Sequence, residues 1–193
     1  MNIKQLKETA QAGDMESQYL LSHKYHEGDG VSKDYEKAFY WVSKAAAQGH
    51  TASQFNLGYM HYHGKATSQD YEKAFFWFSL AAEKGHASAQ NNLGVMYRDG
   101  IGVDEDFEEA FIWFLIASNS SLSCCYDARK SYSGNPNALC NLGLIYAEGS
   151  RLPESKSRAA HWFNLAYIQG SERATELLDE YKLWDDIQKY YFI

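Results

Sequence analysis

A repeat of 36 residues is the feature that most constrains how this chain of 193 residues can fold. Trp41, Trp77 and Trp113 are 36 residues apart, and the hexapeptide at 34–39 recurs unchanged at 70–75. Trp162 follows 49 residues after the third of these tryptophans, which is 36 plus 13. A single copy of such a unit cannot bury its apolar face alone, so the repeat predicts stacked copies of one supersecondary structure.

Each repeat is predicted to form two helices joined by a glycine-containing loop. The second helix has one apolar face, because Ala110, Trp113 and Ala117 are spaced as i, i+3 and i+7. Its N-caps are predicted from side-chain oxygens that accept hydrogen bonds from unpaired backbone N–H groups, at Asp34, Asp70, Asp106 and Ser155. A Gly-His pair ends this helix in the first two repeats, where glycine suits a left-handed backbone.

Small residues inside the helices predict close packing within each repeat. Three glycines fall inside first helices, although an internal glycine costs about 1 kcal/mol relative to alanine. We expect these glycines to let the two backbones approach, and the tryptophans of the second helices to fill the space beside them. The residues expected to form this core are Gly58, Gly94, Gly143, Trp41, Trp77, Trp113 and Trp162.

The repeats predict a single domain that is capped at both ends. The insertion accounts for the 13 additional residues and contains Cys124 and Cys125. The C-terminal cap carries apolar residues that would cover the last exposed helix face. The predicted parts are an N-terminal cap (1–14), four repeats (15–50, 51–86, 87–118 and 137–171), an insertion (119–136) and a C-terminal cap (172–193).

Three segments carry a resemblance to a known family. They are Ser53-Gln54-Phe55-Asn56-Leu57-Gly58, the loop Gly30-Val31-Ser32-Lys33-Asp34, and the helix from Lys37-Ala38 through Trp41 to Gly49. This pattern resembles the Sel-one-like repeat family, a branch of the tetratricopeptide-like proteins. The resemblance implies an all-α fold, a right-handed α/α solenoid. Two departures stand out: Ser22 replaces the first helix glycine, and His61 replaces the repeated tyrosine.

Composition excludes two classes of protein and favours one compartment. The net charge of −7 is unsuited to phosphate backbones, so we expect no nucleic-acid partner. The apolar runs are shorter than the roughly 20 residues of a spanning helix, so we expect no membrane span. Three cysteines, two of them adjacent, do not make a disulfide framework, and they favour a cytoplasmic protein with free thiols.

No catalytic motif is present, and the sequence predicts a protein that is not an enzyme and has no cofactor. The chain contains neither Gly-x-Ser-x-Gly nor His-Glu-x-x-His. His61 and His63 point to different sides of a helix and cannot chelate one ion. His23 and His26 are better spaced, but we interpret them as groove or surface residues and predict no metal site. The acidic run at 104–109 suits a helix N-terminus.

The resemblance also implies where a partner binds. Tetratricopeptide-like solenoids hold partners in a concave groove lined by their first helices, and aromatic side chains there serve as rigid anchors. An alternative for Phe55 is that it packs between adjacent repeats. The predicted partner-binding residues are Tyr19, His23, His26, Phe55, Tyr59, Tyr62, His63, Asn91 and Arg98.

Three functions therefore stay open. The first is a non-catalytic adaptor or scaffold that binds a partner protein or peptide in the aromatic groove. The second is an immunity or inhibitor protein that neutralises a cognate toxin or enzyme, which the acidic charge would suit if the partner is basic. A remote third is a hydrolase of cell-wall or β-lactam substrates. It would need a nucleophile and a base that the sequence does not reveal.

Overall fold

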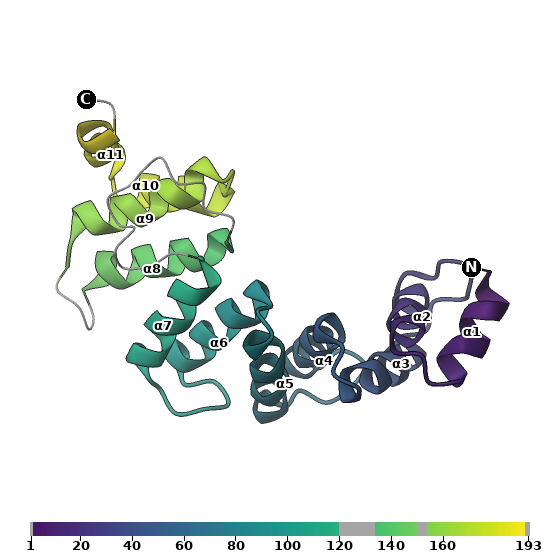
Figure 1. Cartoon of the computed structure of the whole chain (residues 1–193). Helices are drawn as coiled ribbons and strands as arrows, with labels where there is room; N and C mark the ends of the chain where they lie inside the picture. The colour runs from purple at the N-terminus through teal and green to yellow at the C-terminus, as the bar shows by residue number, and fades with distance from the viewer. Residues whose placement is uncertain (1, 120–133, 150–153, 192–193) are drawn as a thin grey trace. The chain divides into compact units, whose positions relative to one another are not determined.

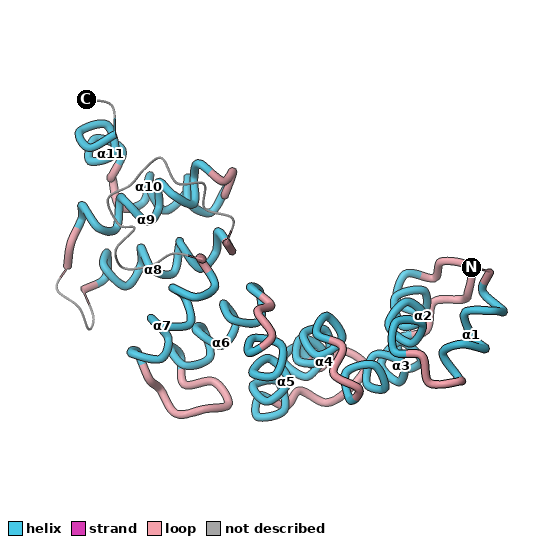
Figure 2. Tube along the Cα trace, in the orientation of Figure 1, coloured by secondary structure: helices cyan, strands magenta, loops and turns pink. Residues whose placement is uncertain are grey.

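The computed structural model describes residues 2–119, 134–149 and 154–191 (Figure 1). These residues form eleven α-helices. The described part of the chain consists of helices and loops, without a β-strand (Figure 2). The all-α fold class is confirmed. Most of the insertion at 119–136, including Cys124 and Cys125, lies outside the described residues. In the described part of the chain, no helix is both long enough and apolar enough to cross a membrane.

The chain divides into two compact units, residues 1–89 with 100–104 and residues 90–99 with 105–193. The first unit contains α1 (Ile3–Gln11), α2 (Met15–Glu27), α3 (Tyr35–Ala47), α4 (Thr51–His63) and α5 (Tyr71–Glu83). Helix α6 (Ala87–Asp99) begins in the first unit and continues in the second. The second unit then contains α7 (Phe107–Ala117), α8 (Pro136–Glu148), α9 (Lys156–Ile168), α10 (Glu172–Glu180) and α11 (Trp184–Tyr191).

The second helix of each repeat begins at the residue predicted as its N-cap. In each case a side-chain oxygen accepts a hydrogen bond from a backbone N–H of the first turn. At the other end, Gly49 and Gly85 have φ angles of 94° and 85°, the left-handed conformation expected of a residue that follows a helix. The confirmed N-caps are Asp34, Asp70, Asp106 and Ser155.

Two histidines also cap helices, a role that the sequence pattern does not indicate. The Nδ1 atom of His50 accepts the backbone N–H of Ser53 at 3.2 Å, and that of His86 accepts the N–H of Ala89 at 3.3 Å. A neutral imidazole has one nitrogen that accepts a hydrogen bond, which makes this possible. The Gly-His pair therefore ends one helix and begins the next, so the connection between them is very short.

The space beside the helix glycines is filled by phenylalanine, which corrects the expectation that tryptophan fills it. A Cβ atom added to Gly58 would lie 2.7 Å from the ring of Phe78, so only glycine leaves room for this ring. The other two pairs, at 2.5 and 2.3 Å, are Gly94 with Phe114 and Gly143 with Phe163. All three rings are fully buried. Each phenylalanine directly follows the repeated tryptophan of its repeat, so the two side chains lie on different parts of the helix surface.

The four tryptophans themselves are less deeply placed than the phenylalanines. Trp162 is buried, whereas Trp41, Trp77 and Trp113 are half-buried. Trp77 packs against a cluster formed by Val42, Ala46 and Leu57. The tryptophans therefore cover the edges of the core, and the phenylalanine rings occupy its interior.

The first repeat lacks this glycine–phenylalanine pair. Ser22 and Val42 stand 36 residues before Gly58 and Phe78. Both are buried, and the hydroxyl of Ser22 donates to the carbonyl oxygen of Tyr19 at 2.7 Å. The side chain of Val42 is smaller than a phenylalanine ring. It therefore leaves unfilled part of the volume beside α2 that a ring occupies in the other repeats.

Polar as well as apolar contacts hold the helices of the second unit together. The amide of Asn141 on α8 donates to Asn91 on α6 at 3.0 Å, and its oxygen accepts from Arg173 on α10 at 3.1 Å. Leu177, Leu178 and other residues of α10 and α11 pack on the cluster that α8 and α9 form. The two C-terminal helices thus cover the apolar face of α9.

Candidate partner-binding pocket on the first unit

A pocket of about 650 Å³ opens on the first unit between α2, α3 and α4. Its walls are mainly apolar and aromatic, with several polar groups among them. We call it the α2–α4 pocket. Its lining residues are Ser22, His23, His26 and Glu27 of α2, Tyr35, Ala38 and Val42 of α3, Phe55, Asn56, Tyr59 and Met60 of α4, and Lys65 and Ala66 after α4.

The α2 side of the pocket carries an imidazole and a carboxylate that are paired with each other. His26 Nδ1 lies 2.7 Å from Glu27 Oε1, and both side chains are about half exposed. The hydrogen bond from His26 lowers the pKa of Glu27 below its usual value. The ring of Tyr35 on α3 meets His26 edge to face at 5.4 Å between centroids. Helix α2 ends directly after this group, at Gly28.

The α4 side carries two aromatic rings whose neighbours hold them in place. Phe55 stacks on His86, with ring centroids 4.4 Å apart and an angle of 19° between the planes. Tyr59 is 38% exposed and lies 4.2 Å from the ring of His63. The ammonium group of Lys65 lies 4.9 Å from the centroid of Tyr59, a cation–π contact. The rings therefore present defined surfaces to the pocket.

Two polar side chains of the pocket keep bonding capacity for a ligand. The amide of half-buried Asn56 makes no hydrogen bond to any residue that the structure describes, although an amide both donates and accepts. Lys65 forms no ion pair within the described ranges, and its ammonium lies 4.9 Å from the centroid of the Tyr59 ring. A peptide backbone and a carboxylate are the groups that such side chains bind.

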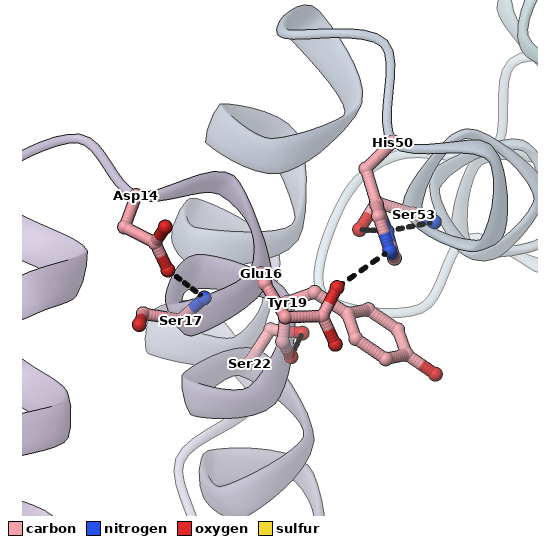
Figure 3. A network of polar contacts seen from close by, with 7 residues as sticks. All are labelled: Asp14, Glu16, Ser17, Tyr19, Ser22, His50 and Ser53. Atoms are coloured by element: carbon pink, nitrogen blue, oxygen red, sulfur yellow. Dashed lines mark hydrogen bonds and ion pairs between the residues drawn. The ribbon is translucent and has the colours of Figure 1, made fainter.

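Tyr19 does not line the pocket. Its ring is 4.5 Å from the ring of His50, and His50 Nε2 lies 3.4 Å from Glu16 Oε2 (Figure 3). On its other nitrogen, His50 contacts Ser53. Phe55 and His86 are the equivalents of Tyr19 and His50, 36 residues later, and the two ring pairs have similar centroid distances, 4.4 and 4.5 Å. This contact between repeats is structural in both places.

The structure brings four of the predicted partner-binding residues together in the pocket: His23, His26, Phe55 and Tyr59. Phe55 lines the pocket and also packs against His86, at the start of the next repeat. Its position is therefore compatible with both roles considered for it, packing between repeats and contact with a partner. Tyr62 and His63 follow on α4, but Tyr62 faces α5, with its ring 5.2 Å from Tyr71 and 6.4 Å from Phe78.

Asn91 and Arg98 belong to the second unit and do not line the pocket. Asn91 is 8% exposed and accepts the hydrogen bond from Asn141, so it holds helices together in the interior of that unit. Arg98 makes a bidentate contact with Asp99 at 2.6 and 2.9 Å. The geometry therefore concentrates the candidate site on the first unit.

Sequence reasoning missed several lining residues, above all Val42 and Lys65. The signal for Val42 is in the repeat itself: the same position is phenylalanine at 78, 114 and 163. The signal for Lys65 is weaker, because this loop has Gly64 followed by Lys65 where the other loops differ in sequence. The tertiary structure shows that these two positions open onto one pocket.

A family model, described as the Sel1 repeat, matches four segments of the chain: 16–50, 51–86, 87–122 and 136–171. The chain belongs to the Sel1 repeat family. Sel1 repeats generally act as protein–protein interaction modules, and proteins built from them are generally non-catalytic. The solenoid expected from the sequence is thereby confirmed. No curated protein matches the sequence.

Two solved Sel1 repeat structures are similar to this one. A protective antigen of uropathogenic Escherichia coli with an SLR fold is 32% identical with a TM-score of 0.80, covering 92% of this chain and 35% of the antigen. A Sel1 repeat protein of Oxalobacter formigenes is 29% identical with a TM-score of 0.73, covering 88% of this chain and 64% of that protein. This chain thus spans about a third of the first structure and just under two thirds of the second.

Proposed function

We propose that this Sel1 repeat protein is a non-catalytic adaptor that binds a segment of a partner protein in the α2–α4 pocket. The observation that carries the proposal is the pocket itself, whose apolar and aromatic walls surround an amide with no hydrogen-bond partner among the described residues. Interaction sites combine such aromatic anchors with a few polar groups that fix orientation. The general role of Sel1 repeats in protein interactions supports the same conclusion.

Tyr59 is the residue that best tests the proposal. It is 38% exposed and lines the pocket, so its ring offers contact area without being part of the core. Tyr62 is less suitable, because it packs against α5 and its loss would also reduce stability. Tyr40 supplies a matched control, since it is a tyrosine on α3 that is 53% exposed and does not line the pocket.

The experiment is affinity capture from a lysate of the source cell with wild type, Tyr59→Ala and Tyr40→Ala. We expect one dominant partner that Tyr59→Ala loses and Tyr40→Ala retains, and titration with the purified partner should show binding at least about tenfold weaker for Tyr59→Ala. All three proteins should have the same helical circular dichroism. A partner that Tyr59→Ala retains at full affinity would contradict the proposal and move the site to another surface.

The identity of the captured protein then separates the remaining functions. A basic toxin or enzyme that loses activity when bound would identify an inhibitor, and a component of a larger complex would identify an adaptor. Hydrolysis of a chromogenic β-lactam in proportion to the concentration of purified protein would instead support the hydrolase alternative.

A further inference from the structure

The α2–α4 pocket lies where the other repeats place a phenylalanine ring of their own. In the second repeat, the ring of Phe78 packs on Gly58, and its centroid lies 6.4 Å from that of Tyr62. The equivalents of these three residues, 36 positions earlier, are Val42, Ser22 and His26. All three line the pocket. The surroundings that hold a phenylalanine ring of the chain itself in the second repeat therefore line a pocket in the first.

The walls of the pocket suit an aromatic side chain. Ala38 and Val42 contribute apolar surface from α3, and Phe55 and Met60 contribute it from α4. Aromatic rings pack well against other rings and against thioethers. The volume of about 650 Å³ exceeds what one ring needs, and it leaves room for the backbone that carries the ring. Such a size is ordinary for a ligand site.

The position of Lys65 favours an anionic group beside that ring. Glu27 is the carboxylate in the lining, and it is already bonded to His26. Lys65 has no carboxylate partner among the described residues, and its ammonium lies 4.9 Å from the centroid of the Tyr59 ring that lines the pocket. An unpaired ammonium at the edge of an apolar pocket attracts a carboxylate of the ligand.

We propose that the pocket receives an aromatic side chain of the partner protein, which takes the place of the phenylalanine that the first repeat lacks, and that Lys65 binds an acidic residue next to it in the partner sequence. This inference rests on the proposed function, because it specifies what the partner places in the same pocket. Val42 and Ser22 are then the residues that determine specificity, since their small side chains create the space for the ring.

The chain itself supplies the variant that closes the pocket. Val42→Phe alone would press a ring against the Cβ atom of Ser22, a contact that the other repeats avoid by having glycine. The double variant Ser22→Gly/Val42→Phe reproduces the pair found at Gly58 and Phe78. A matched control is Ser43→Gly, which removes another helical serine whose hydroxyl also bonds a backbone carbonyl but which does not line the pocket.

The probes are three capped dipeptide amides: N-acetyl-Phe-Glu-amide, N-acetyl-Phe-Gln-amide and N-acetyl-Ala-Glu-amide. Amide chemical shifts of the full chain report binding during titration. We expect saturable binding of the Phe-Glu probe to wild type and Ser43→Gly, and at least about tenfold weaker binding to the double variant. Lys65→Gln should reduce the preference for Phe-Glu over Phe-Gln to about one, because only the carboxylate depends on the ammonium.

Equal affinity of wild type for the Phe-Glu and Ala-Glu probes would overturn the inference, and so would undiminished binding by a folded double variant. A preference for Phe-Glu that persists in Lys65→Gln would overturn the acidic part. The captured partner distinguishes this failure from failure of the proposed function. If the captured partner needs Tyr59 but binds the double variant normally, the pocket is an interaction site that receives no aromatic ring, and only this inference fails. If the partner does not need Tyr59, the proposed function itself fails.

Discussion

His61 stands where the other three repeats have a tyrosine, at positions 25, 97 and 146. It is 7% exposed, and its Nδ1 atom has no hydrogen-bond partner among the described residues. Burial, and then the ammonium of Lys73, hold the pKa of His61 below its usual value, while Asp70 opposes this shift. The folded chain therefore favours the neutral imidazole.

This residue contributes to the acid sensitivity of the protein, together with His63, His86 and His161, whose pKa values burial also lowers. Because the pKa of His61 is lowered on folding, the unfolded chain binds a proton more readily, so stability is present above about pH 6.5 and falls below it. We expect the melting temperature to decrease between pH 7.5 and 5.5, and to decrease less in His61→Tyr, which restores the tyrosine of the other repeats. His23→Gln, a change at an exposed histidine, should keep the wild-type slope. Equal slopes for all three proteins would contradict this account.

Single residues also show the limit of reading the sequence position by position. The resemblance predicted His23, His26, Phe55 and Tyr59 as groove residues, and the structure places all four in the lining of the α2–α4 pocket. Val42 was not, because a valine in an apolar helix has no chemical signature of its own. Val42 matters because it places no ring beside Ser22, whereas the equivalent phenylalanines pack against glycines. Those ring–glycine contacts become visible only in the folded chain.

Within each pair of helices, a glycine on one helix and a phenylalanine on the other set the distance between backbones. In α4 and α5 these are Gly58 and Phe78. The ring of Phe78 is 1% exposed, whereas the side chain of Trp77 is half-buried. The fully buried ring of this helix pair is therefore the phenylalanine, although the tryptophan is the more obvious mark of the repeat.

Three adjacent aromatic residues of α5 test this ranking. We expect Phe78→Ala to lower the free energy of unfolding by about 3–5 kcal/mol, because it leaves a cavity in the core. Trp77→Ala should cost less, since part of its surface is already in water. Phe76→Ala, at a position that is 53% exposed, should stay within about 0.5 kcal/mol of wild type. Urea denaturation measures all three. If Trp77→Ala lowers the free energy of unfolding more than Phe78→Ala does, this ranking is wrong and the tryptophan contributes more to the core.

The helices themselves were largely predictable, because caps and loops repeat with the same period. The predicted N-caps begin α3, α5, α7 and α9. The short Gly-His connections were seen only as helix ends, since histidine is an unusual N-cap and the bond through its Nδ1 atom needs the folded geometry. The limits predicted for the caps, repeats and insertion stay predictions.

At the scale of the whole molecule, the chain divides into two compact units. In the first, α1 to α3 pack around Leu6 and Leu21. In the second, the largest cluster joins α7 to α11, and the hydrogen bonds of Asn141 connect α6, α8 and α10. In repeat proteins each element contacts only its neighbours, so stability is close to a sum of local terms.

A mutation in the second unit should therefore leave the first unit intact. Phe163 is fully buried against Gly143, and Phe163→Ala should speed amide hydrogen exchange in α8 and α9 by lowering the free energy of local opening. Exchange in α2 and α3 should be unchanged. Hydrogen exchange read by mass spectrometry tests this helix by helix. Faster exchange throughout the chain would show that the two units open together.

The sequence by itself determined the family and the helical pairs, because these follow from the residues of a 36-residue repeat and from local capping. The face on which a partner is expected came from the resemblance to that family. Only the tertiary structure decided which ring fills each helix pair and where one is missing. The physical reason is that periodicity assigns residues to helix faces, whereas a pocket depends on the volumes of side chains that meet from three helices. Ser22 and Val42 are small residues in the sequence, and together they open the pocket in the fold.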